Sequence, residues 1–170
     1  MENDKNQYQI PSELKYDGFW ESFYSTYEKE DRRLPFYEEV AFYTRGSLRK
    51  PWQVEDECIP QLLKKWETLK EELDKLYQNR DTNGVILPMK QAIALLVQFI
   101  YWANGEPARL DRIKKLNELT YKPVNATERL EFILVRPSLY HSFMQMAELF
   151  EEMGKLYQKK KAMDAKLKKR

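Results

Sequence analysis

Twelve consecutive residues, 92–103 (AIALLVQFIYWA), constrain the fold of this chain more than any other feature. Gln98 is the only polar side chain among them, so a helix made from this run would have no face suited to water. Such a helix must be enclosed by protein or by lipid, and twelve residues are too few for a bilayer, which needs about 20. Pro88 suits a first helical turn, and Asn104 with Gly105 suits the end of a helix. The run therefore predicts a buried helix at the centre of the fold.

Other segments carry apolar residues at helical spacing and predict the helices that surround this core. One long helix is predicted from about Ile59 to Arg80. The last helix of the chain is predicted from a seam of apolar residues: Leu139, Phe143, Met146, Phe150, Met153 and Tyr157. With 170 residues the chain is most simply one domain. We therefore predict an all-α fold, a single-domain helical bundle of about six or seven helices around a central buried helix, with a basic C-terminal helical extension.

The predicted boundaries within the chain are a disordered N-terminus over residues 1–10, an all-helical domain over residues 11–157 and a basic tail over residues 158–170. Shorter helices are expected around residues 19–27, between Pro35 and Gly46, and over residues 109–119. The first two regions are unusually aromatic. Their rings are interpreted as core for short helices, and the alternative is a stacking or partner-docking surface.

The break between the last two helices is predicted from capping residues and a proline. Asn125 is placed as the N-cap of one helix, which Pro137 should end or kink, and Ser138 as the N-cap of the next.

The charge of the chain is distributed unevenly, although its net value is only +2. Residues 155–170 carry a net charge of +7 and residues 1–154 a net charge of −5. The possible contacts to nucleic acid or to a partner are therefore the basic residues of the tail: Lys155, Lys159, Lys160, Lys161, Lys166, Lys168, Lys169 and Arg170. The alternative is a solvated helix end, in which lysines complement the helix dipole and keep the surface soluble.

Motifs for catalysis, cofactors and metals are mostly missing from the sequence. The five glycines are isolated, so neither a phosphate-binding loop nor a dinucleotide fingerprint exists. One histidine and one cysteine cannot form a zinc site. We therefore expect no cofactor, no metal and no catalytic residue, and the absence of a long apolar run predicts no membrane span.

Two arrangements of residues could support catalysis, and a plainer structural role is favoured for each. A nucleophilic pair of Cys58 and His141 is disfavoured, because the acids of residues 55–57 oppose a thiolate and His141 is expected to be partly buried beside the apolar seam. Those three acids are interpreted as complementing the dipole of the helix that follows, rather than as a cation site. Glu148 and Glu152 are interpreted as a solvated helix face.

Two stretches, QAIALLVQFIYWANGEP (91–107) and ATERLEFILVRPSLYHSFMQMAELFEEMGKLYQK (126–159), resemble the YpoC-like family of small proteins from Bacillus and its relatives. The resemblance covers roughly the second half of the chain. It implies a cytosolic bacterial protein, and it assigns no chemical role to any residue. The resemblance also implies a gene that lies near genes of DNA replication and repair.

The leading functional prediction is a non-enzymatic, cytosolic protein with a protein-interaction or accessory role. The alternative is an accessory factor in DNA replication or repair that contacts nucleic acid through the basic tail. Base stacking would add little there, since the tail has no aromatic residue after Tyr157. A weaker third possibility is an enzyme with a carboxylate-based or Cys58-based site.

Overall fold

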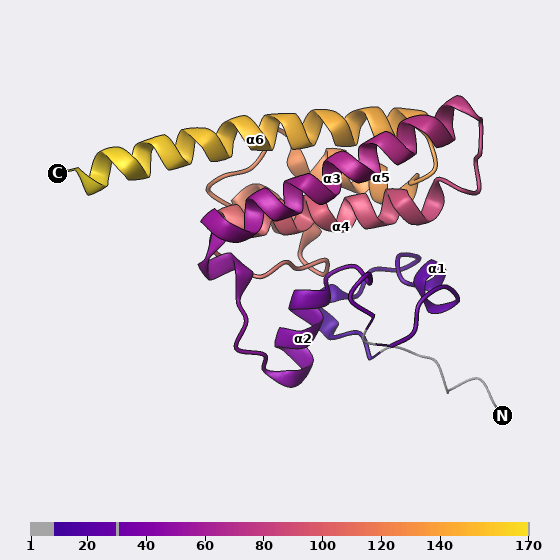
Figure 1. The fold of residues 1–170 in the computed structure, drawn as a ribbon, viewed down its shortest axis with the longest axis horizontal. Helices are drawn as coiled ribbons and strands as arrows, with labels where there is room; N and C mark the ends of the chain where they lie inside the picture. The colour runs from indigo at the N-terminus through magenta and orange to yellow at the C-terminus, as the bar shows by residue number, and fades with distance from the viewer. Residues whose placement is uncertain (1–8, 30, 170) are drawn as a thin grey trace.

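The computed structural model describes residues 9–29 and 31–169, and every regular element in that part of the chain is a helix (Figure 1). The α-helices are α1 (Glu21–Tyr24), α2 (Tyr37–Arg45), α3 (Glu55–Gln78), α4 (Ile86–Ala103), α5 (Ala126–Val135) and α6 (Tyr140–Lys168). Three short 3-10 helices accompany them: η1 (Ser12–Leu14), η2 (Pro51–Gln53) and η3 (Ile113–Glu118). The predicted all-α bundle with a basic C-terminal helical extension is confirmed.

Helix α4 lies at the centre, as the apolar run predicts. Fourteen of its 18 residues are buried, and Leu96 in its middle is fully enclosed. The helix begins six residues before the predicted run, because Ile86, Leu87 and Pro88 form its first turn. Its length and composition would suffice to cross a membrane, but 78% of it is already enclosed by the rest of the chain.

Helices α3 and α6 pack beside α4 through aromatic and aliphatic side chains. The rings of Trp66 on α3 and Phe150 on α6 stack with their centroids 4.1 Å apart. The predicted seam of α6 is buried at every position except Leu139, which precedes the helix and is 45% exposed. Helix α3 begins four residues before the predicted start, so the three acids at residues 55–57 form its first turn and complement the helix dipole there.

An N-terminal layer, comprising α1, α2 and the turns that connect them, covers another side of α4 (Figure 1). Aromatic side chains pack this layer against the core. The prediction that the N-terminal rings are core residues is confirmed for five of them: Phe19, Trp20, Phe23, Phe36 and Trp52. Polar side chains of α4 also hold it: the buried Lys90 donates from Nζ to the carbonyl of Gly18 (2.8 Å). Residues 1–8, where most of the predicted disorder falls, lie outside the described residues.

Two predicted helices are shorter than expected. Only Glu21–Tyr24 is α-helical in the region around residues 19–27, and the rest is turns. The segment predicted over 109–119 forms the 3-10 helix η3 instead. Its apolar residues Ile113 and Leu116 are three residues apart, and this spacing also suits a 3-10 helix, which places positions i and i+3 on one side.

Asn125 is the N-cap residue of α5, as predicted, and the break at Pro137 is confirmed by the end of α5 and the start of α6, whereas the predicted N-cap at Ser138 is wrong. Asn125 has a left-handed backbone (φ +53°), and its side chain makes no capping hydrogen bond. Leu139, not Ser138, precedes the first residue of α6, and no side chain caps that helix. The segment is fastened instead by the buried Ser142, whose hydroxyl donates to the Arg136 carbonyl (2.6 Å).

Candidate functional site

The basic end of α6 continues the last core helix without a break. α6 passes through the predicted boundary at residue 158 and ends at Lys168. Residues 162–169 are all exposed, and Figure 1 shows this end of the helix extending past the rest of the bundle. The exposed part of the helix spans about 10 Å, from a rise of about 1.5 Å per residue. The predicted contact residues from Lys155 to Lys168 therefore lie on one continuous helix whose first part belongs to the core.

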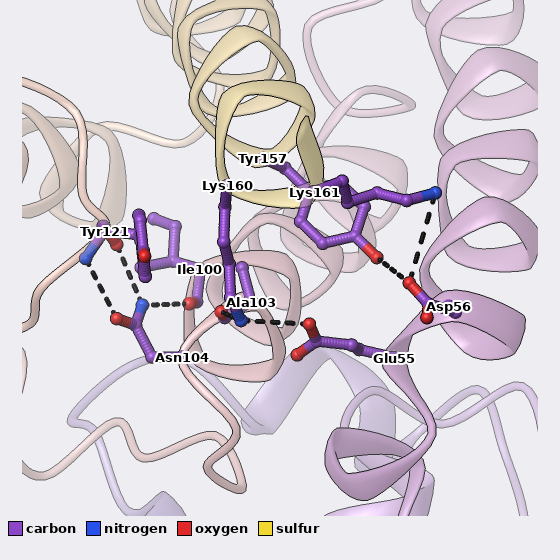
Figure 2. A network of polar contacts seen from close by, with 9 residues as sticks. All are labelled: Glu55, Asp56, Ile100, Ala103, Asn104, Tyr121, Tyr157, Lys160 and Lys161. Atoms are coloured by element: carbon purple, nitrogen blue, oxygen red, sulfur yellow. Dashed lines mark hydrogen bonds and ion pairs between the residues drawn. The ribbon is translucent and has the colours of Figure 1, made fainter. Parts of the chain in front are cut away.

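Lys160 is a structural residue of this helix. Its ammonium group donates to Glu55 Oε1 (2.9 Å) and to the carbonyl of Ala103 (2.6 Å), and it lies over the Tyr121 ring (Figure 2). Glu55 is in the first turn of α3 and Ala103 is the last residue of α4. The Lys160 ammonium group therefore contacts both the negative end of the α4 dipole and an acidic side chain of α3. The side chain of Lys160 is only 15% exposed. It therefore joins three helices and contributes little charge to the surface.

The polar contacts around Lys160 extend to both sides, as Figure 2 shows. Asn104 follows α4 and fastens the loop at Tyr121: its Nδ2 donates to the Tyr121 carbonyl (2.8 Å), and the Tyr121 N–H donates to its Oδ1 (2.9 Å). The buried Tyr157 donates from its hydroxyl to Asp56 Oδ1 (3.3 Å). Burial, followed by the charges of the nearby acids, raises the pKa of the Tyr157 phenol. This junction holds the start of the projecting segment in place.

The eight predicted cations thus fall into separate groups. Lys160 and Lys161 belong to the junction, since Lys161 lies 4.0 Å from Asp56 and over the Tyr157 ring. Lys155 pairs with Glu151 one turn earlier on the same helix (3.5 Å). Arg170 lies outside the described residues. The remaining lysines are exposed: Lys159, Lys166, Lys168 and Lys169.

Two apolar side chains accompany these lysines on the projecting segment. Met163 is 58% exposed and Leu167 is 66% exposed. They are four residues apart and therefore lie on one side of the helix. They follow Leu156 and Lys160 at helical spacing, so the same stripe that packs on the core continues past it. Sequence reasoning ended the stripe at Tyr157, because the charged residues that follow obscure these two positions.

The pair of Cys58 and His141, which the sequence already disfavours, is not assembled in the structure. Cys58 lies near the start of α3, whereas the hydroxyl of Tyr77 near its end donates to the carbonyl of Leu139, just before His141. Tyr77 lies nineteen positions after Cys58 on α3, which is a rise of roughly 28 Å along the helix.

Neither member of that pair has the environment of a nucleophile or its base. Burial raises the pKa of the Cys58 thiol, and the charges of Glu57 and Glu38 add to this effect while Arg49 opposes it. The expected partial burial of His141 is wrong, since its ring is exposed and lies edge-on to Phe132 (5.4 Å between centroids).

The carboxylates considered for acid–base chemistry are joined to an arginine. Arg129 of α5 donates from both terminal nitrogens to Glu152 (2.9 Å each) and lies 3.7 Å from Glu148. These ion pairs fasten α5 to α6. Across residues 9–29 and 31–169 no cluster of histidine, cysteine and acidic side chains has a geometry that could hold a metal ion.

A second region, which sequence reasoning missed, is a cleft of about 780 Å³. One wall is formed by α2 and the segment before it, and the other wall is formed by α3 and α4. Its lining includes five basic side chains: Arg32, Arg33, Arg45, Arg49 and Lys65. They are spread over 34 positions that also contain acids and aromatics, so no local run of charge marks them in the sequence.

These features define a class: an all-helical bundle with a projecting basic helix end and a separate basic cleft. Within that class, the chain belongs to the YpoC-like protein family, whose sequence model matches residues 56–165. The chain is also similar to the protein named "Uncharacterized protein YpoC" of Bacillus subtilis (strain 168), with 34% identity over 132 residues. That match covers 76% of this chain and 79% of the relative. No solved structure matches the chain.

The match to the family extends beyond the second half of the chain, where the resemblance was expected. It spans α3 to α6 and reaches residue 165, so it includes the junction at Lys160 and the start of the projecting segment. The N-terminal layer precedes it.

Proposed function

We propose that the protein is a non-enzymatic interaction protein of the cytosol that docks on a partner protein through the projecting end of α6. The observation that supports this is the exposed pair Met163 and Leu167, held on a rigid helix among exposed lysines. A helix of this kind fits an apolar groove with an acidic rim, the helix-in-groove mode of recognition. The single cysteine, which is buried and unpaired, is compatible with a reducing compartment.

Packing favours a protein partner over nucleic acid. Burying a methionine or leucine side chain stabilises a complex by about 1.5–3 kcal/mol, and aliphatic side chains gain little of this from a phosphate backbone. Two of the basic residues, Lys160 and Lys161, are already engaged with the body of the protein. Asp164 also lies within the projecting segment and would repel phosphates.

The test is photo-crosslinking in cells, with a photoreactive residue at position 163. We expect the photoreactive residue to link one defined protein. The wild-type chain, without that residue, should also capture this protein, and the Met163→Asp/Leu167→Asp variant should not. Met144→Asp is the matched control, because Met144 is an exposed methionine on the same helix within the body. Wild type, the double variant and the Met144→Asp control should have the same melting temperature, since each altered side chain is exposed. Capture that is the same in the double variant and in the control would refute the proposal.

Nucleic acid is the competing outcome of the same experiment. If the linked material were digested by nuclease, the tail would be a nucleic-acid contact instead. The salt dependence would then report how many cations take part. Lys159, Lys166, Lys168, Lys169 and Arg170 would give a slope against log salt of about −3.5 for a single strand, from about −0.7 for each contact.

A further inference from the structure

The cleft between α2 and the α3–α4 pair is a site distinct from the projecting end of α6. Figure 1 shows α2 on one side of α4 and α6 on the other. The volume of the cleft, about 780 Å³, lies within the range of roughly 300–1,000 Å³ that is usual for small-molecule sites. Its lining combines basic side chains with apolar side chains and amides, which suggests a ligand of mixed character.

Positive charge dominates the lining. Glu38 is the one acidic side chain among the described lining residues, and it accepts a hydrogen bond from Arg49 Nε (2.9 Å). Asp31, which lies beside the lining, pairs with Arg33 (2.7 Å). Against these two carboxylates stand Arg32, Arg33, Arg49 and Lys65, so the lining keeps a net positive charge. A ligand with several negative charges would balance this positive charge.

Two of the cations are well placed to receive such a ligand. Arg32 comes from the segment before α2 and Lys65 from α3, so they belong to different walls of the cleft. Both are exposed, and neither forms an ion pair with any described residue. Arg49 uses only Nε in its contact with Glu38, so its two terminal nitrogens can still donate. Guanidinium groups of this kind suit the oxygen pairs of phosphate groups.

Two amide side chains from α4 line the same cleft. Gln91 and Gln98 lie seven residues apart, on one side of the helix. Gln91 donates from Nε2 to the hydroxyl of Tyr27 (3.1 Å). Gln98 donates from Nε2 to Glu39 Oε1 (2.8 Å). Since each amide nitrogen is engaged and neither amide oxygen accepts a hydrogen bond from a described residue, both oxygens can accept an N–H group from a ligand.

The lining also includes apolar side chains that a flat ring could contact, among them Leu95 and Trp102. We propose that the cleft binds a nucleoside polyphosphate. The phosphates meet Arg32, Arg49 and Lys65, while the base lies against the apolar lining and donates N–H groups to the amide oxygens of α4. The contacts assigned here all come from side chains, and the sequence has no glycine-rich phosphate-binding loop.

Calorimetric titration with ATP and with GTP, at about 50 mM salt so that screening is weak, tests the proposal. We expect saturable binding of at least one of the two at a single site. Inorganic tripolyphosphate and the free nucleoside should each bind at least tenfold more weakly, because each retains only half of the contacts. No saturable binding of either nucleotide, or equal affinity for tripolyphosphate, would overturn the assignment.

Variants locate the binding in the cleft. Arg32→Gln and Lys65→Gln should each raise the Kd about tenfold or more, as expected for the loss of one charged hydrogen bond. Lys64→Gln is the matched control, since Lys64 is exposed on the same helix and does not line the cleft. Equal effects at positions 64 and 65 would show non-specific attraction and refute the site.

A chain that ends at Ala162 separates this proposal from the role of α6. It lacks the docking segment and keeps the whole cleft, so it should bind nucleotide as the full chain does. Loss of nucleotide binding in that chain would place the ligand on α6 instead.

Discussion

The buried carboxylate of Glu39 holds α2 to the core, and replacing it tests how the N-terminal layer is fixed. Glu39 is fully buried and accepts three hydrogen bonds: from Gln98 Nε2 (2.8 Å), Trp102 Nε1 (2.7 Å) and the Ala108 N–H (3.2 Å). Glu39→Leu would leave these three donors without an acceptor. At about 1–3 kcal/mol for each unsatisfied donor, and with some recovery by water and rearrangement, we expect a loss of about 3–5 kcal/mol in the free energy of unfolding.

Glu39→Gln should be much milder. Its amide oxygen can replace the carboxylate oxygen that faces Trp102 and Ala108. Its amide nitrogen can donate to Gln98, provided that the Gln98 amide turns over and presents its oxygen. All of the buried polar groups then keep a partner, so we expect a change of less than about 1 kcal/mol at acidic pH.

The pH dependence separates these two variants further. Burial raises the pKa of Glu39, and the three hydrogen bonds only partly oppose this. The folded protein therefore holds the proton more tightly than the unfolded chain, and stability is lost as the pH rises from the unfolded pKa through the folded one. Across that window wild type should lose up to about 1.4 kcal/mol per pH unit relative to Glu39→Gln.

Urea denaturation of both proteins between about pH 4 and pH 8 measures this difference. Tryptophan fluorescence is a suitable probe, since Trp102 belongs to the contact. If wild type instead gained stability over Glu39→Gln as the pH rose, the three donors would outweigh burial and the argument would be wrong. A Glu39→Leu protein as stable as wild type would show that the contact does not hold the layer.

Three further substitutions test the core and the two ends of α6 by chemical denaturation. Leu96→Asp should abolish cooperative unfolding, because it places an unpaired charge at a fully enclosed position. Lys160→Met should lower the free energy of unfolding by about 1–3 kcal/mol, because it removes the hydrogen bonds that Lys160 donates to Glu55 and Ala103. Lys159→Met, on the exposed side of the helix, should leave the stability almost unchanged. Ser142→Ala should cost about 1–2 kcal/mol, since it removes a buried hydrogen bond, whereas Ser138→Ala should be neutral. A Ser138 variant less stable than the Ser142 variant would restore the predicted cap.

The elements that could be predicted from the sequence are those that rest on periodic burial. The apolar run at residues 92–103 and the seam of α6 each repeat over several turns, and tertiary packing cannot easily override so regular a pattern. The capping hydrogen bond expected at Asn125 and the cap position expected at Ser138 depend on the dihedral angles of single residues, which neighbouring segments decide. Asn125 adopts a left-handed backbone, and two residues later the Thr127 hydroxyl donates to the Ile113 carbonyl (3.1 Å) on η3. A contact with a residue 14 positions away has no local signature.

The cleft could not be predicted for a related reason. Its basic residues come from two segments that the fold brings together, and the amides on its floor are two of the few polar residues on α4. Sequence reasoning treated Gln98 as an isolated polar residue within an apolar run. Its partner is Glu39, 59 positions earlier in the chain. A buried carboxylate and a buried amide each look unfavourable in isolation, and only their pairing explains why the core tolerates both.

The lysines of α6 show why counting charge in a sequence overestimates a binding surface. Lys159, Lys160 and Lys161 are consecutive, but about 100° of rotation separates each from the next around the helix axis. Lys159 therefore faces solvent, Lys160 reaches the end of α4, and Lys161 lies over the Tyr157 ring. The apolar positions follow the same geometry, since the side of the helix that carries Lys160 within the junction carries Met163 and Leu167 beyond it. One stripe thus begins in the core of this protein and continues onto the surface that we assign to its partner.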